Sequence, residues 1–199
     1  VYKRQVNAAV DAGVVAVAAI GNDGANRVTS VGAADKAITV GSIDDDNSIE
    51  RDDDEIASYS NYGPRADDDD GDSLDELKPD VVAPGSGIIS AQYAAPNPLP
   101  VGDQPRASDD YTSKDGTSMA CPAVAGLAAL ILSYDNTLTP EDVKNIIKQT
   151  AEQRGAPSSP SIDNRWNNQY GYGIIDGETA FRCLIGGECT QIVGGAEWV

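Results

Sequence analysis

Histidine is absent from the 199 residues of this chain, which also contain only three cysteines, one methionine and one phenylalanine. Without an imidazole, the chain lacks the usual group that takes a proton from a serine or cysteine nucleophile. Basic residues are scarce as well, because 14 Lys and Arg face 32 Asp and Glu, for a formal net charge of −18. This charge argues against nucleic acid or an anionic membrane as a partner, since both would repel the chain.

Membrane-spanning segments and targeting signals are not expected either. We expect no membrane span and find no signal peptide at the start of the chain. No internal repeat is visible, and the length suits one domain with a sizeable core. Residues 1–5 do not begin with Met, and Val-Tyr-Lys-Arg-Gln is what one frame of a sequencing adapter would encode. We interpret them as a non-native scar and expect the true protein to extend upstream.

The three cysteines allow two different interpretations. Cys121 lies among small apolar residues, which favours a small core residue over a thiol nucleophile, although both remain open. Cys183 and Cys189 are close in sequence and could pair if the protein is exported, which the sequence does not decide.

Acidic residues gather in three Asp runs, at residues 44–46, 52–54 and 67–70. All three lie in segments that otherwise look like loops. We interpret them as a solvated, salt-adapted surface, because a calcium site needs oxygens that converge on one point rather than adjacent side chains. Structural calcium nevertheless stays an open alternative.

Apolar periodicity predicts a helix over residues 6–12, a strand buried on both faces over 14–20 and a second strand over 37–42. Weaker strands are expected at 57–60, 80–83 and 88–91. The acidic stretch 64–78 is predicted to be a mobile surface loop, and the proline-rich stretch 93–110 a loop that walls a cleft. Thr139 is expected to cap a helix over 140–151, and a final helix is expected over 177–184.

The stretch from Asp115 to Leu132 is predicted to organise the domain. From Ser118 onward its residues are small and apolar, which predicts a buried helix with Pro122 tolerated near the first turn. Ser118 would then lie at the positive end of this helix. Position alone favours Thr117 or Ser118 as a helix cap, and the alternative is that Ser118 is a nucleophile.

The string Gly116-Thr117-Ser118-Met119-Ala120, followed by Pro122 and Val124-Ala125-Gly126, resembles the nucleophile motif of subtilisin-like serine proteases. Further pieces that resemble this family occur in the expected order: Ala19-Ile20-Gly21-Asn22-Asp23-Gly24, Ala37-Ile38-Thr39-Val40-Gly41-Ser42, Tyr59-Ser60-Asn61-Tyr62-Gly63-Pro64 and Lys78-Pro79-Asp80-Val81-Val82-Ala83-Pro84-Gly85. The resemblance covers residues 6–184, and residues 185–199 are interpreted as a C-terminal extension. It implies an α/β fold, a partial subtilisin-like domain with a mainly parallel sheet, helices on both faces and a buried central helix that starts at Ser118.

The same resemblance implies roles for two residues. Ser118 would be the nucleophile, and the side-chain amide of Asn22 would stabilise the oxyanion together with the backbone N–H of Ser118. No cofactor would be required for catalysis. The family's order of Asp, His and Ser places the two missing triad members upstream of residue 6. Asp115 is expected to contact the start of the helix rather than act as a base, and Ala123 departs from the family, which usually has His there.

We therefore predict an extracellular serine endopeptidase that acts on polypeptides, present here as a fragment that is inactive by itself. The alternative is a non-catalytic member that binds peptides or a partner along the same cleft. An acidic calcium-binding module is a third, less favoured possibility.

Overall fold

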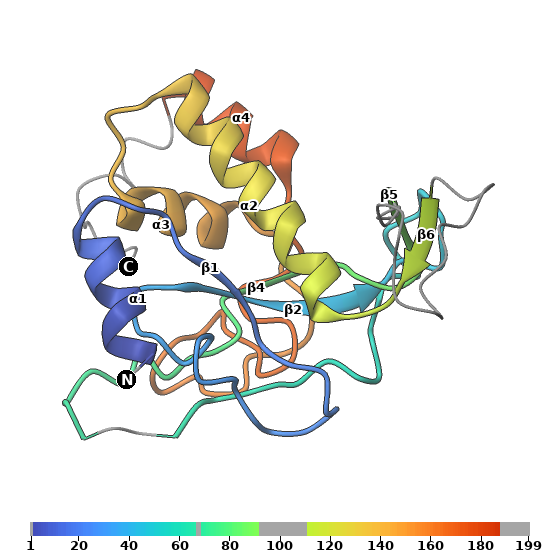
Figure 1. The fold of residues 1–199 in the computed structure, drawn as a ribbon, viewed down its shortest axis with the longest axis horizontal. Coiled ribbons are helices and arrows are strands. Elements are labelled where there is room, and N and C mark those ends of the chain that lie inside the picture. The colour runs from blue at the N-terminus through green and yellow to red at the C-terminus, as the bar shows by residue number, and fades with distance from the viewer. Residues whose placement is uncertain (1, 67–68, 92–110, 188–199) are drawn as a thin grey trace, which may run out of the picture.

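A computed structural model describes residues 2–66, 69–91 and 111–187 of the chain. Its elements are α1 (Tyr2–Asp11), β1 (Val17–Ala19), β2 (Ile38–Asp44), β3 (Glu55–Ile56), β4 (Val81–Pro84), β5 (Ile88–Ala91), β6 (Tyr111–Lys114), α2 (Thr117–Tyr134), α3 (Pro140–Thr150) and α4 (Gly177–Gly186). Figure 1 shows how these elements are arranged around the sheet.

The central sheet is mainly parallel, as the sequence predicts. β2 lies in its middle and pairs in parallel with β1 on one side and with β4 on the other. β3 is a short antiparallel addition to the end of β2, where Ile43 pairs with Ile56. The strand expected over 57–60 is wrong, because Ser60 N–H donates to the carbonyl of Ala57 and the chain turns there.

Helices cover both faces of this sheet. Side chains of β2 and β4 that include Val40 and Val81 pack with α2, α3 and α4 into one core, and Figure 1 shows these three helices on the same side of the strands. On the opposite face, Val6 of α1 packs against Ala18 and Ala37. Alternate residues of a strand point to opposite faces, so β1 contributes to both clusters.

α2 is only half buried, which corrects the expectation of a helix enclosed on every side. Its buried residues are Thr117, Ala120, Val124, Leu127, Ala128 and Ile131. Leu130 and Tyr134 are 57 % and 54 % exposed. The helix also corrects the expectation about membrane spans, because by length and composition alone it could cross a bilayer. Its buried face packs on the sheet, as in the core helix of a soluble protein, which would pass the same test.

Several other sequence predictions can be compared with the structure. α1 begins at Tyr2 rather than at residue 6, while the foreign origin of residues 1–5 stays a prediction. The acidic stretch 64–78 contains no helix or strand in its described part, but both its ends are buried, at Arg65 and at Leu77. The expected loop 93–110 and the Cys183–Cys189 pairing involve residues outside the described ranges.

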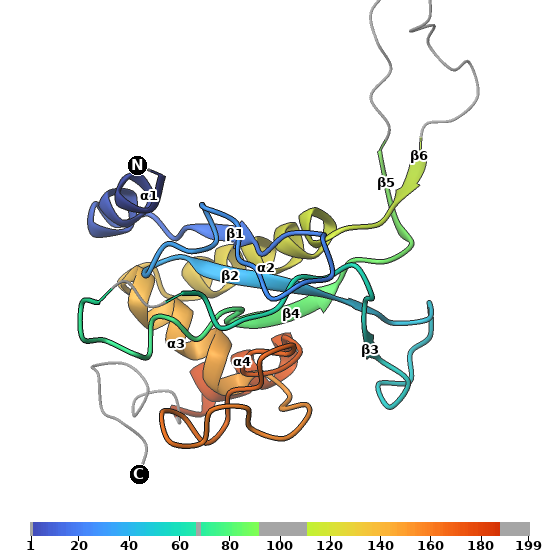
Figure 2. The ribbon, with the colours of Figure 1, turned by 90° about the horizontal axis from the view of Figure 1, so that it is seen from below.

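The cap of α3 agrees with the sequence. Thr139 accepts a hydrogen bond from Asp142 N–H, and the Asp142 carboxylate accepts from Thr139 N–H. β5 was expected, but its partner β6 was not. The two form a separate antiparallel hairpin that leads directly into α2, and Figure 2 shows this hairpin projecting from the body of the domain.

Candidate active site

The start of α2 carries the predicted nucleophile. Gly116 is the residue before the helix, with a φ of 148°, a conformation that residues with a side chain rarely adopt. No side-chain hydrogen bond caps the helix at this position. The interpretation of Thr117 or Ser118 as the cap is therefore wrong. Ser118 is the second helical residue, and its side chain is exposed and makes no hydrogen bond within the described ranges.

The turn after β1 brings Asn22 to this helix start. The side-chain oxygen of Asn22 accepts hydrogen bonds from the backbone N–H and from the hydroxyl of Thr117, each 2.9 Å long. Thr117 is fully buried, and its hydroxyl also accepts from Gly21 N–H at 3.3 Å. These bonds join residues about 95 positions apart, so Asn22 makes a tertiary contact rather than only a local turn.

Two hydrogen-bond donors remain at the start of α2, close to Gly116. The first is the backbone N–H of Ser118, which lies in the first helical turn and has no partner among the residues that the structure describes. The second is the amide nitrogen of Asn22, which likewise has none there, and which would lie 3.3 Å from a Cβ built on Gly116. Both donors lie at the positive end of the α2 dipole, which favours negative charge. The arrangement can therefore hold an oxyanion next to an exposed hydroxyl.

Two nearby residues are not suited to act on Ser118. The half-buried thiol of Cys121 packs against the core under α2, and burial raises its pKa, which disfavours the nucleophilic thiolate. The carboxylate of Asp115 accepts a hydrogen bond from Gly87 N–H at 2.6 Å. Asp115 thus bonds to the residue that precedes β5. The expected contact with the start of α2 is therefore wrong.

A buried ion cluster lies where β2 and β4 begin and was not foreseen from the sequence. Lys78 Nζ is 2.9 Å from one oxygen of Asp80, and Lys144 Nζ is 3.4 Å from the other. Asp80 also accepts from Thr39 N–H at 2.7 Å, so it links α3 to β2. All three charged side chains are buried. Nothing in the sequence pattern identified Lys144 as a buried residue.

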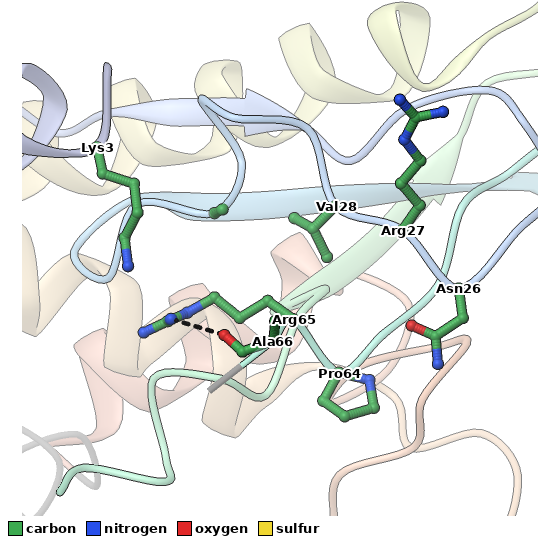
Figure 3. A pocket seen from close by; sticks show the side chains of 8 residues that line it. Lys3, Asn26, Arg27, Val28, Pro64, Arg65 and Ala66 are labelled. Carbon is green, nitrogen blue, oxygen red and sulfur yellow. Dashed lines mark hydrogen bonds between the residues drawn. The ribbon is translucent and has the colours of Figure 1, made fainter. Parts of the chain in front are cut away.

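A cavity of about 610 Å³ lies away from Ser118, beside α1 (Figure 3). Three basic side chains line it together with Asn26, Val28, Ala33, Pro64 and Ala66. Each basic group faces a carboxylate, because Lys3 and Arg65 lie 2.9 and 3.0 Å from Asp35, and Arg27 lies 3.6 Å from Asp23. The cavity therefore contains no predicted site residue and offers no unneutralised cationic cluster.

One acidic group could hold a cation by its geometry. Carboxylate oxygens of Asp70, Asp75 and Glu76 all lie within 4.8 Å of one another. Burial raises the pKa of Asp75 to about 6, although the charge of Arg65 opposes the change. The Arg65 guanidinium contacts Asp75 and lies 3.6 Å from Glu76, so its positive charge already partly neutralises these carboxylates. Structural calcium thus stays an untested alternative to the solvated acidic surface that the sequence favours.

Comparison with known proteins gives one consistent family. The model of the subtilase family matches residues 1–173. Serine protease AprX of Bacillus subtilis (strain 168) is 36 % identical over 181 residues, which are 89 % of this chain and 37 % of AprX. Subtilisin BL of Lederbergia lenta is 31 % identical over 90 % of this chain and 51 % of its own length.

Solved structures agree with this result. A protease of Pseudoalteromonas arctica PAMC 21717 superposes with a TM-score of 0.61 at 29 % identity, over 89 % of this chain and 45 % of that one. The chain thus spans roughly a third to a half of the length of the relatives described here. The partial subtilisin-like fold predicted from the sequence is confirmed by these similarities.

Proposed function

The chain belongs to the subtilase family, and on that premise we propose that the full-length protein is a serine endopeptidase that cleaves polypeptides through an acyl-enzyme on Ser118. The observation that carries this proposal is the exposed Ser118 hydroxyl beside two unused donors, its own N–H and the amide of Asn22. Attack of Ser118 Oγ on a peptide carbonyl would place the developing negative charge between these donors.

The proton of Ser118 needs an acceptor that this chain does not contain, because it has no histidine. We propose that a His and its orienting Asp come from an upstream part of the full-length protein, in the order that the family follows. Two surface features support this proposal. The apolar outer face of α2 is exposed at Leu130 and Tyr134, and in the described ranges only β2 pairs with β1. A further part of the same domain would cover this face and extend the sheet.

The proposed substrate is an extended polypeptide, the proposed location is extracellular, and the chemistry requires no cofactor. A catalytically inactive protein that binds peptides along the same cleft is the alternative. It is favoured if the upstream sequence lacks a His and an Asp, since Ser118 would then have no base.

The test compares full-length wild type with Ser118→Ala on a chromogenic peptide, together with labelling by a serine-directed phosphonate. We expect turnover and stoichiometric labelling of the wild type, loss of both in the variant, and peptide binding that is nearly unchanged. The isolated 199-residue chain should neither turn over nor label, because its hydroxyl stays protonated without a base. Robust activity of the isolated chain would contradict the proposed upstream base, and an inactive full-length wild type would favour the binding protein.

A further inference from the structure

One short segment contacts both the turn that carries Asn22 and Gly116, the residue before α2. Residues 59–61 form the end of the turn after β3 and the residue that follows it, and we call them the 59–61 segment. Its buried members are Ser60 and Asn61, which are 3 % and 1 % exposed. Ser60 Oγ accepts from Ser42 N–H at 3.0 Å, so the segment is fixed to the central strand β2. The sequence had marked it only as part of a family-like string.

Asn61 holds the turn that carries Asn22. Its side-chain oxygen accepts from Asp23 N–H at 2.7 Å and from Ala25 N–H at 3.3 Å, and its amide nitrogen donates to the Asp23 carboxylate at 3.2 Å. Its backbone N–H donates to the carbonyl of Gly21 at 3.0 Å. Residues on both sides of Asn22 are therefore bonded to one buried side chain and its backbone.

Tyr59 binds the residue that precedes α2. Its hydroxyl accepts from Gly116 N–H at 3.2 Å, while Gly116 N–H also reaches the carbonyl of Gly85 at 2.9 Å. The same hydroxyl lies 2.9 Å from Ser42 Oγ and 3.0 Å from Ser86 Oγ, both on buried residues. One proton donated and two bonds accepted satisfy this phenol completely.

The backbone of Tyr59 closes the connection, because its carbonyl accepts from Gly24 N–H at 2.8 Å. A single residue thus bonds to the Asn22 turn through its backbone and to the residue before α2 through its side chain. Donors that must converge on one oxyanion need their separation fixed to a fraction of an ångström.

We propose that the 59–61 segment is a clamp that fixes the distance between the amide of Asn22 and the backbone N–H of Ser118. This inference rests on the proposed function and deepens it, because it assigns Tyr59 and Asn61 as positioning residues for the two oxyanion donors. Neither residue is required to touch the substrate. Their effect on the reaction passes through Gly116 on one side and through the Asn22 turn on the other.

The first test is Tyr59→Phe in the full-length protein, which removes only the hydroxyl. Tyr62→Phe is the matched control, because the Tyr62 hydroxyl makes no hydrogen bond within the described residues. We expect Tyr59→Phe to lower kcat roughly tenfold, a fraction of the ~100-fold loss that a misplacement of 1 Å can cause, with KM within about twofold of wild type. Tyr62→Phe should leave both constants unchanged.

A second measurement does not depend on activity. Hydrogen–deuterium exchange is followed in Ser118→Ala proteins, which cannot digest themselves, with and without Tyr59→Phe. We expect faster exchange at residues 114–119 when the hydroxyl is removed, and no change with Tyr62→Phe. Unchanged exchange, or unchanged kcat in an active background, overturns the clamp.

The Asn61→Ala variant tests the other side of the clamp. It frees the N–H groups of Asp23 and Ala25, so exchange over residues 21–25 should accelerate and kcat should fall further than in Tyr59→Phe. If this variant fails to fold, the Tyr59 comparison alone decides. If the full-length wild type neither turns over nor labels, the proposed function is wrong, and the exchange measurements still support or overturn the clamp.

Discussion

The hydroxyl of Thr117 lies 2.9 Å from the side-chain oxygen of Asn22, and this contact determines which end of the Asn22 amide is available. Because the oxygen is engaged by Thr117 twice, the nitrogen is the end that remains free beside Ser118. An amide that could rotate would present its oxygen half of the time and repel an oxyanion. Thr117, which is fully buried, therefore orients a donor for the proposed oxyanion.

Thr117→Val should lower kcat of the full-length enzyme about fivefold, because it removes a hydrogen bond worth roughly 1 kcal/mol that orients Asn22. Thr117→Ser is the control, since it keeps the hydroxyl and loses one methyl group. Steady-state kinetics on a chromogenic peptide provide the measurement. Equal activity of the Val and Ser variants would show that the backbone N–H of Thr117 is sufficient to orient the amide.

Asn22→Leu should lower kcat more than it raises KM, because a donor aimed at the oxyanion acts chiefly in the transition state. We expect a loss of roughly 10²–10³-fold, the size known for such an Asn in a subtilisin. Asn22→Asp keeps the acceptor for Thr117 but places a carboxylate where the oxyanion forms, so its loss should be at least as large. An effect confined to KM would assign Asn22 to ground-state binding instead.

The sequence predicted the strands and the helix start of the candidate active site better than it predicted the contacts around them. The parallel strands β2 and β4 and the start of α2 follow from apolar runs and from Gly116, because burial and backbone freedom are local properties. The exposed face of α2 did not follow, since an apolar pattern alone does not say whether a neighbour is present. The bonds of Tyr59 could not be foreseen either, because they join residues 17 to 57 positions apart.

The buried ion cluster makes stability depend on pH. Burial alone would raise the pKa of Asp80, but the charges of Lys144 and Lys78 outweigh it and hold this pKa below its ordinary value. A carboxylate whose pKa is lower in the folded state contributes stability above its unfolded pKa of about 3.9 and loses it in acid. Lys78 acts at the other end of the scale. Burial lowers its pKa to about 7 in the folded state. Between pH 7 and about 10 the unfolded chain therefore binds more protons at Lys78 than the folded protein, so the free energy of unfolding rises with pH in this range.

Asp80→Asn should lower the free energy of unfolding by roughly 3–5 kcal/mol at pH 7, because the buried side chains of Lys78 and Lys144 lose the carboxylate that compensates their burial. The difference from wild type should narrow as pH falls below about 4, where Asp80 contributes progressively less. Urea unfolding of the Ser118→Ala full-length protein, with and without the substitution, measures both effects. Asp52→Asn is the control, since Asp52 is exposed and should change neither. A constant difference across pH 3 to 7 would contradict the assignment to Asp80.

The last prediction concerns the acidic surface, where sodium chloride should stabilise the protein and calcium should add little beyond its ionic strength. Described residues of the Asp runs, such as Asp46 and Asp53, are exposed, and a net charge of −18 makes the folded state repel itself. Salt screens this repulsion over a Debye length of ~10 Å at 0.1 M.

Bound calcium would behave differently, stabilising the fold with the logarithm of its excess over the dissociation constant. Melting temperatures are therefore compared in rising sodium chloride and in micromolar to millimolar calcium at fixed ionic strength. Asp75→Asn serves as the variant, because Asp75 belongs to the one group of carboxylates in the described ranges that lies close enough to share a cation. We expect calcium to shift neither protein by more than about 2 °C, which corresponds to roughly 0.5–1 kcal/mol for a domain of this size. A larger shift in wild type that Asp75→Asn abolishes would establish a calcium site at Asp70, Asp75 and Glu76, and would show that the Arg65 charge does not exclude a metal ion from these carboxylates.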